Sequence, residues 1–298
     1  WVLDNITTLQ QDAINSLDSE PALFQPKTTI RYRRPRGMPN TEVPDYPQPA
    51  VVIDYYLPEN FSERLVMEIL DDAGNVVNRF TNADEDPDDG PGEQALTDMG
   101  TNQTIFLVDD SLSTDAGLNR SRWTMRHFGA WHSNEDRRYQ NGPMVKPGTY
   151  TVRLSAGDST MEHAFELQVD PRVLAGGTTL ADISAQVDLQ LEITELLSSA
   201  RRLEDELDTE QEELEELETE NGLSAQQQAR LENVNAVLSA LQTAEGIYME
   251  PMLTAQISYL YNMINAADQA PGQEAEMRFT ELNQQFQALT AEDAGADD

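Results

Sequence analysis

A heptad pattern of apolar residues in the last third of the chain restricts the possible folds more than any other feature. Residues spaced alternately four and three apart fall on one side of an α-helix, so the pattern predicts a helix from about 181 to 220. Such a helix is about 60 Å long, and it needs neighbouring segments to cover its apolar side. The pattern consists of Leu189, Ile193, Leu196, Ala200, Leu203, Leu207, Leu214 and Leu217, and it is interrupted at Glu210.

The residues after this helix predict the segments that cover it. Asn221 and Gly222 end the first helix, and Ser224 with Gln227 forms a capping box that begins a second. Three apolar faces follow: Leu231, Val234, Leu238, Leu241 and Tyr248; then Leu253, Ile257, Leu260, Ile264 and Ala267 after Pro251; then Phe279, Leu282, Phe286 and Leu289 after the turn at 270–272. We therefore predict an antiparallel α-helical hairpin or coiled-coil bundle over residues 178–290, and a disordered acidic tail over 291–298.

Residues 49–172 carry the alternation of β-strands instead. Seven short runs are separated by turn sequences such as DDAGN and AGDS, which is the spacing of an immunoglobulin-like β-sandwich. The runs are AVVIDYYL (50–57), RLVMEIL (64–70), VVNRF (76–80), TIFLV (104–108), NRSRWTMRHF (119–128), GTYTVRLSAG (148–157) and STMEHAFELQVD (159–170). The predicted fold class is therefore multidomain β plus α, with the sandwich first and the helical bundle second.

Three further segments complete the predicted organisation. Residues 170–179 form the boundary between sandwich and bundle, because they combine a proline with two glycines. Residues 1–9 (WVLDNITTL) alternate like a strand. Residues 10–48 predict an irregular, proline-rich linker. The linker contains Arg31, Arg33, Arg34 and Arg36, which either bind an anion or pair with the protein's own carboxylates.

The charge of the chain narrows the choice of partners. There are 54 acidic and 19 basic side chains, a net charge of −35, and residues 178–298 contribute 26 acidic and 4 basic side chains. Such a surface repels phosphate backbones and anionic lipid headgroups, so we expect no nucleic-acid partner. Two interpretations remain, which are solubility, including in a salty habitat, and capture of a basic partner.

Several kinds of chemistry find no support in the sequence. The absence of cysteine excludes disulfides, thiolate metal sites and cysteine nucleophiles. The sequence contains no run of about 18 apolar residues, so it predicts no membrane insertion. No nucleophile elbow, phosphate-binding loop, dinucleotide fingerprint or zinc-protease motif occurs, so the sequence predicts no catalytic or cofactor-binding residue.

One motif indicates a metal. In DEDPDDG (84–90), Asp84, Asp86 and Asp88 have the spacing that opens a calcium-binding EF-hand loop. Position six of the loop is Asp89 rather than glycine, Pro87 intrudes, and no terminal glutamate follows in register. The two interpretations are a Ca²⁺ site and an exposed acidic loop.

Aromatic and acidic clusters offer two more candidates. WTMRHFGAWH places His127 and His132 beside Trp123 and Trp131, which predicts either an aromatic loop plug or a surface for stacking a ligand. The third histidine, His163, is remote in sequence. The acidic run at 203–220 is either the solvated face of a coiled coil or a tip that docks a basic partner.

The order of several segments resembles a known family. WVLDNITTL, LFQPKTTIRYR, AVVIDYYL, VMEILDDAGNVVNRF, AGLNRSRWTMRH, KPGTYTVRL and YNMINAADQAPGQEAEMRFTELNQQ occur in this order. Together they resemble the C-terminal region of bacterial sortilin/VPS10-like β-propeller proteins with BNR (Asp-box) repeats, often labelled glycosyl hydrolases. ILDDAGNVV and PGTYTV are also similar to a FlgD-like immunoglobulin-like module.

This resemblance implies a setting and a role. In the family a large propeller precedes the region, so residues 1–9 would be the closing strand of its last blade. The Asp-boxes and any catalytic residues would belong to that propeller. The implied function is a non-catalytic C-terminal module of an exported, periplasmic or extracellular protein, acting as spacer and as interaction or oligomerisation arm. Its partner would be the propeller or another protein chain. The alternative is a glycan or peptide hydrolase whose site this region completes together with the propeller.

Overall fold

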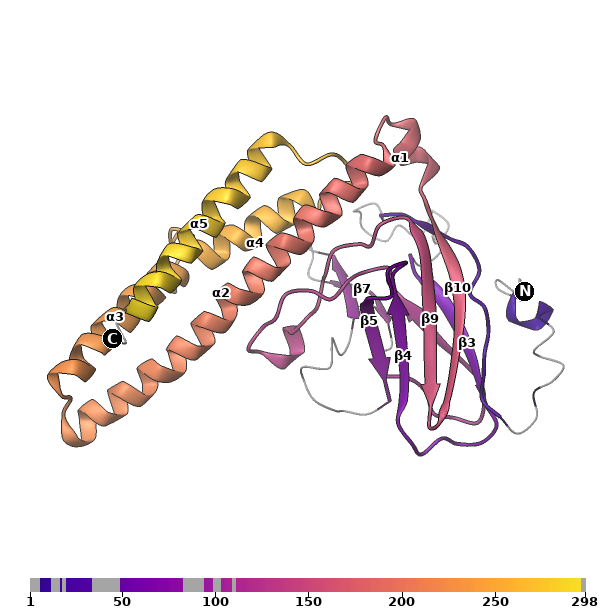
Figure 1. Cartoon of the computed structure of the whole chain (residues 1–298), viewed down its shortest axis with the longest axis horizontal. Helices are drawn as coiled ribbons and strands as arrows, with labels where there is room; N and C mark the ends of the chain where they lie inside the picture. Colours follow the sequence, from indigo (N-terminus) through magenta and orange to yellow (C-terminus); the bar gives the residue numbers. More distant parts are fainter. Residues whose placement is uncertain are drawn as a thin grey trace. The chain divides into compact units, whose positions relative to one another are not determined.

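The structure is a computed structural model of the chain, and it describes residues 6–11, 17, 20–33, 49–82, 94–98, 103–108 and 111–295 (Figure 1). The chain divides into two compact units. The β unit comprises Trp1–Gly129 and Arg138–Leu180, and the α unit comprises Ala130–Arg137 and Ala181–Asp298. The protein is therefore β plus α, as its sequence predicts.

The described part of the β unit forms a five-stranded sheet in the order β2-β10-β9-β4-β5, a three-stranded sheet in the order β1-β3-β8, and the pair β6-β7. Strands β2 and β10 are parallel, and the other pairs are antiparallel. The strands are β1 (Ala22–Leu23), β2 (Thr29–Arg31), β3 (Val51–Leu57), β4 (Leu65–Leu70), β5 (Val76–Thr81), β6 (Gln94–Asp98), β7 (Gln103–Val108), β8 (Gly117–Trp123), β9 (Gly148–Ala156) and β10 (Ser159–Val169). All seven predicted runs contain a strand, although β8 ends at Trp123, before the run does.

Apolar side chains of the two larger sheets form one hydrophobic cluster. On β3, Val51, Ile53 and Leu57 are completely buried, because alternate residues of a strand point to the same face. Trp123 lies in the same cluster, with its ring centroid 5.5 Å from that of Tyr150. These alternating residues give the β unit a core of its own.

The segment predicted to be an irregular linker contributes two strands to these sheets. Strand β1 pairs with β3, and β2 pairs with β10. Phe24 is buried, and so is Arg31, whose Nε donates a hydrogen bond of 2.6 Å to the carbonyl of Val145. Part of the segment 10–48 therefore belongs to the β unit. Arg34 and Arg36 lie outside the described residues.

The amino-terminal segment differs from a continuous strand where the structure describes it. Trp1–Asn5 lie outside the described residues, and Thr8–Gln10 form a 3-10 turn (η1). The hydroxyl of Thr8 donates to the buried carboxylate of Asp54. Arg120 binds that carboxylate through Nε and Nη2, at 2.7 and 2.9 Å. The Thr8 hydroxyl thus attaches the turn to Asp54 on β3, and Arg120 balances the charge of that carboxylate.

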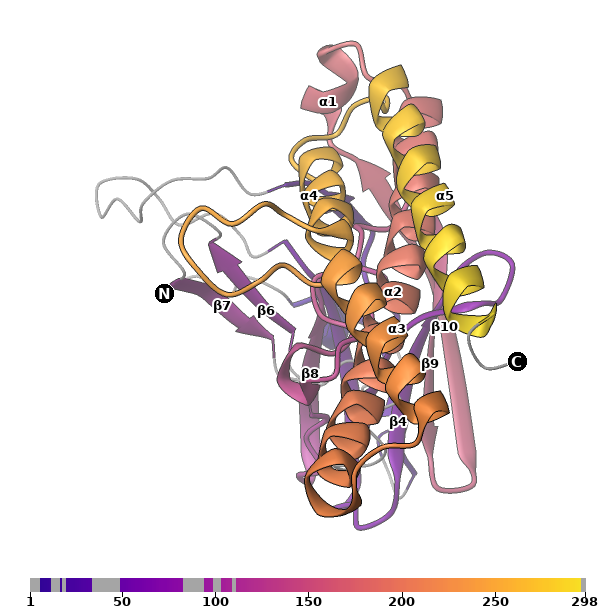
Figure 2. The same cartoon turned by 90° about the vertical axis from the view of Figure 1, so that its left-hand side faces the viewer.

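Four long helices dominate the α unit (Figure 2). The predicted helix over 181–220 is confirmed as α2 (Leu180–Asn221). The capping box is also confirmed, because Ser224 accepts from the N–H of Gln227 and the Gln227 side chain accepts from the N–H of Ser224. The helices that follow are α3 (Ala225–Leu241), α4 (Leu253–Ile264) and α5 (Gln273–Gly295), and the short α1 (Pro171–Ala175) belongs to the β unit.

A second hydrophobic cluster holds these four helices together, with buried residues from each of them. The interruption of the heptad pattern at Glu210 has a partner here. Arg230 on α3 donates to Glu210 through Nε and Nη2, at 2.7 and 2.6 Å, and its Nη1 lies 2.7 Å from Asp293 on α5. Arg230 therefore ties α2, α3 and α5 together at the one charged position of the pattern.

Two boundaries in the α unit differ from the prediction. Helix α3 ends at Leu241, so Tyr248 is not on its apolar face and is fully exposed. Helix α5 continues to Gly295, so residues 291–295 are helical and not part of a disordered tail. The ion pair between Asp293 and Arg230 stabilises that last turn. Residues 296–298 lie outside the described residues.

Residues 130–137 belong to the α unit, although the residues before and after them in the sequence belong to the β unit. The backbone N–H of Trp131 donates to Ser198 on α2, and Arg201 donates to the carbonyl of Trp131. The guanidinium of Arg202 lies 4.9 Å from the Trp131 ring centroid, a cation–π distance. Trp131 is thus an anchor for this loop on α2.

Candidate interaction surface

The structure describes the residues of the predicted aromatic site but not those of the predicted metal site. Asp84, Asp86 and Asp88 lie outside the described residues, so the calcium prediction stays a prediction. Over 111–295 and the other described ranges, no group of three or more acidic or histidine side chains is placed to hold a metal ion. Trp123 and Trp131 are both buried, which favours the aromatic plug over a stacking surface for a ligand.

Two of the three histidines, His163 and His132, form hydrogen bonds within their own units. His163 on β10 forms a hydrogen bond of 3.0 Å through Nε2 with the carbonyl of Leu23 on β1. His132 accepts from the N–H of Asn134 through Nδ1. His127 lies in the β unit and His132 in the α unit.

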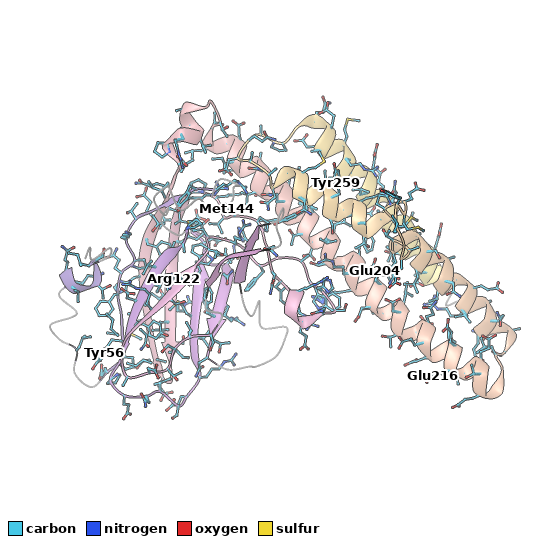
Figure 3. All side chains as sticks on the ribbon, turned by 180° about the vertical axis from the view of Figure 1, so that it is seen from behind. Tyr56, Arg122, Met144, Glu204, Glu216 and Tyr259 are labelled. Atoms are coloured by element: carbon cyan, nitrogen blue, oxygen red, sulfur yellow. The ribbon has the colours of Figure 1, made fainter. Side chains whose placement is uncertain are left out.

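The acidic surplus of the α unit is concentrated on α2. All four basic residues of 178–298 are engaged within the unit: Arg201 and Arg202 at Trp131, Arg230 at Glu210 and Asp293, and Arg278 at Glu281. Six exposed glutamates near the end of α2 have no ion-pair partner among the described residues, and they are Glu212, Glu213, Glu215, Glu216, Glu218 and Glu220. Glu216 is labelled toward this end of the helix in Figure 3.

The loop between α3 and α4, residues 242–252, has an unusual backbone. Gly246 has a φ of 152°, and a Cβ there would lie 3.0 Å from Cγ and Sδ of Met249, so the side chain of Met249 folds over the glycine. Tyr248 has a φ of 63°, a left-handed conformation that costs a non-glycine residue about 1 kcal/mol. The base of the loop is closed by Thr243, whose hydroxyl accepts from the N–H of Met252 at 2.9 Å.

This conformation presents apolar side chains to solvent. Ile247 is 84% exposed, Tyr248 is fully exposed, and Met249 is 45% exposed. A backbone turn that carries a cost and buries none of these side chains is the kind of local feature found at binding sites. The segment Ile247–Met249 is named the apolar loop tip below.

An open hollow of about 440 Å³ lies at the base of this loop. Its wall includes Gln211 from α2 and the loop residues Glu245, Met249 and Glu250. Neither Glu245 nor Glu250 has an ion-pair partner among the described residues. The α3 side of the wall is uncharged, and it contains Asn235, Leu238 and Ser239. The hollow is therefore acidic and without a cation from the described chain.

Glu204 lies deeper in the α unit, on α2. Its Oε1 accepts a hydrogen bond of 2.5 Å from the hydroxyl of Thr254 on α4. Burial raises the pKa of Glu204, and the Thr254 bond and the charge of Arg201 oppose that rise. Burial also lowers the pKa of Arg201. The ionised form of Glu204 is thus less stable in the folded protein than in the unfolded chain.

Glu204→Gln is therefore expected to stabilise the α unit at neutral pH. Because the folded-state pKa is raised, the wild type loses stability as pH rises from the unfolded value of about 4.5 through the folded value. The variant does not, so its thermal midpoint should be higher by about 2 °C at pH 7, a modest shift because the group is partly exposed. The difference should vanish near pH 4.5. Thermal unfolding of both proteins across this range measures it. Glu206→Gln, at an exposed position of the same helix, is the control, and an equal shift there would contradict the interpretation.

No protein-family model matches the chain, and no curated protein matches it either. No described helix combines the length and apolar composition that crossing a membrane requires.

Sequence reasoning missed the apolar loop tip because Tyr248 continues the apolar spacing of α3. Gly246 and Pro251 bracket this tip in the sequence, and together they were the available signal that the helix ends earlier.

Proposed function

We propose that the protein is a non-catalytic interaction module, in which the α unit binds a basic, partly apolar segment of another protein. In this proposal the β unit is an immunoglobulin-like sandwich that acts as a spacer. The α unit is an antiparallel helical hairpin that acts as an arm. An exported protein with an upstream propeller, which the sequence resemblance implies, is a setting where such a spacer and arm would serve.

The observation that carries the proposal is the apolar loop tip beside two carboxylates that lack cations. Burying the side chains of Ile247 and Tyr248 in an interface would contribute several kcal/mol, at about 1.5–3 kcal/mol for each large apolar side chain. Glu245 and Glu250 stand at either side of this tip and line the hollow. An apolar anchor flanked by charges of one sign is a common arrangement in protein interfaces.

Charge decides which partner fits. A second copy of this chain would bring another net charge of −35 to the surface, and like charges oppose such an encounter. A segment with lysine or arginine next to apolar residues would meet the unpaired carboxylates of the hollow and of α2. The same carboxylates would also increase the rate at which this segment associates at low salt, because the Debye length is then about 10 Å or more.

A defined probe tests this proposal. A short synthetic amphipathic peptide of lysine and leucine should bind the full chain saturably in isothermal titration calorimetry, and more weakly as NaCl is raised. The same peptide with glutamate in place of lysine should not bind. Ile247→Ser combined with Tyr248→Ser should weaken binding at least tenfold, which corresponds to about 1.4 kcal/mol.

Matched variants separate docking from general attraction to an acidic protein. Glu245→Gln with Glu250→Gln should weaken binding, whereas Glu274→Gln with Glu276→Gln, in the first turn of α5, should leave it nearly unchanged. Leu174→Ser, at an exposed leucine of the β unit, is the control for the apolar change. Equal effects of test and control variants would mean that the probe is held only by net charge, and the proposal would be wrong.

A further inference from the structure

Two glutamines of α2 are enclosed in the α unit at the carboxyl end of α4. Gln186 is 1% exposed and Gln190 is completely buried. The Nε2 of Gln186 donates to the carbonyls of Ile264 and Ala267, at 2.6 and 2.5 Å. The Nε2 of Gln190 donates to Oδ1 of Asn265 at 3.2 Å. The two backbone carbonyls thus orient the amide of Gln186, and the amide of Gln190 pairs with that of Asn265.

Two side-chain oxygens of these glutamines accept no hydrogen bond from the described residues. Gln186 uses both of its N–H bonds, and among the described residues no donor reaches Oε1 of Gln186 or Oε1 of Gln190. Exchanging O and N in Gln186 would place its oxygen against two carbonyl oxygens, so that alternative is worse. Buried amide oxygens without a donor are unfavourable and uncommon in folded proteins.

Gln186 and Gln190 are four residues apart on α2, and both are buried against the end of α4. Residues four apart on a helix are neighbours on the same face, with Cβ atoms about 5–6 Å apart. The carboxyl end of α4 adds partial negative charge, so the ligand must present hydrogen atoms or positive charge to the site. Two oxygens without donors match the two O–H donors of one water molecule. Inorganic cations such as Ca²⁺ and Mg²⁺ need more than two oxygen ligands.

We propose that one buried water molecule bridges Oε1 of Gln186 and Oε1 of Gln190 and forms part of the joint between α2 and the end of α4. The water donates to both oxygens, while the two Nε2 groups hold Ile264, Asn265 and Ala267. The joint thus consists of direct hydrogen bonds from the two Nε2 groups and of hydrogen bonds from the water to the two Oε1 atoms. It fixes the end of α4 against α2, and it does not depend on the binding role of the loop at the other end of α4.

Nuclear magnetic resonance of the full chain, labelled with ¹⁵N at glutamine side chains, tests this site. Cross-relaxation between a long-lived water and the Nε2 protons of both Gln186 and Gln190 is expected. Gln190→Met should abolish the water signal at Gln186, and Gln186→Met should abolish it at Gln190. Gln211→Met is the control, because Gln211 lies on the same helix and donates to Asn235 outside this site.

Two results would overturn the proposal. One is the absence of a long-lived water at both glutamines in the folded wild type. The other is a shift of the Gln186 and Gln190 resonances when KCl or choline chloride replaces NaCl at constant ionic strength, with no such shift at Gln211. That second result would identify a monovalent cation as the ligand instead.

Discussion

Replacing Gly142 by alanine is expected to destabilise the β unit by about 3 kcal/mol, at the upper end of the cost of overpacking. A Cβ at this position would lie 2.0 Å from the carbonyl oxygen of His127 and 2.5 Å from the carbonyl carbon of Phe128. Both are backbone atoms, so neither can move aside by a side-chain rotation. Urea denaturation at 25 °C, followed by the fluorescence of the buried Trp123, would measure the loss as a lower midpoint.

The control for this variant is Gly176→Ala. A Cβ at Gly176 would lie 3.3 Å from its nearest atom, the carbonyl oxygen of Val173, and the φ of −74° suits any residue, so the change should cost much less than Gly142→Ala. If Gly142→Ala were as stable as Gly176→Ala, the close approach of the segment around Gly142 to His127 and Phe128 would be wrong.

Arg230→Met is the second large effect, with an expected loss of about 2–4 kcal/mol from the α unit. The variant leaves Glu210 and Asp293 without their cation, and removing one member of a largely buried ion pair costs more than the pair itself contributes. Hydrogen bonds from Arg230 lower the pKa of Glu210. Their contribution in the wild type is therefore present above the unfolded pKa and is lost as pH falls through the folded one.

Arg278→Met provides the comparison, because Arg278 pairs with Glu281 at the surface, where both side chains are largely solvent-accessible. Such a pair contributes about 0–1 kcal/mol. Circular dichroism at 222 nm during urea titration follows the helices in both variants. If Arg230→Met lost no more stability than Arg278→Met, the contacts of Arg230 with Glu210 and Asp293 would not stabilise the packing of α2, α3 and α5. The gap between the two should also narrow below about pH 4.

The elements that could be predicted from sequence are those set by local periodicity. The leucines of α2 repeat over many turns, and Ser224 with Gln227 marks a helix start through its own hydrogen bonds. Strands such as β9 place an apolar residue at every second position, where it is buried, so their existence follows from the pattern of apolar residues. None of these features requires knowledge of a distant partner.

The features that could not be predicted depend on contacts between distant residues. Arg31 is buried because Val145, more than a hundred positions later, accepts its hydrogen bond. Glu210 interrupts an apolar seam, and only the position of Arg230 explains it. Trp131 lies in a loop whose partners, Ser198 and Arg201, are on α2. In each case the deciding partner is brought close by the fold and leaves no local mark in the sequence.

The candidate surface was predictable only in its charge. The acidic run at 203–220 has two interpretations in the sequence, the solvated face of a coiled coil and a tip that docks a basic partner. The apolar loop tip is a different matter, because Tyr248 fits the apolar face of α3 by spacing. The helix ends at Leu241 instead, and the loop that follows turns at Gly246.

Hydrogen exchange of the full chain, with and without saturating lysine–leucine probe, tests the central claim most directly. We predict slower exchange in residues 242–252 and in the adjoining end of α3, with unchanged exchange in strands β3, β4 and β9 of the β unit. The same experiment on the variant Ile247→Ser with Tyr248→Ser should show no slowing. Slower exchange confined to the β unit, or none at a probe concentration that saturates binding, would contradict the assignment of the α unit as the interaction arm.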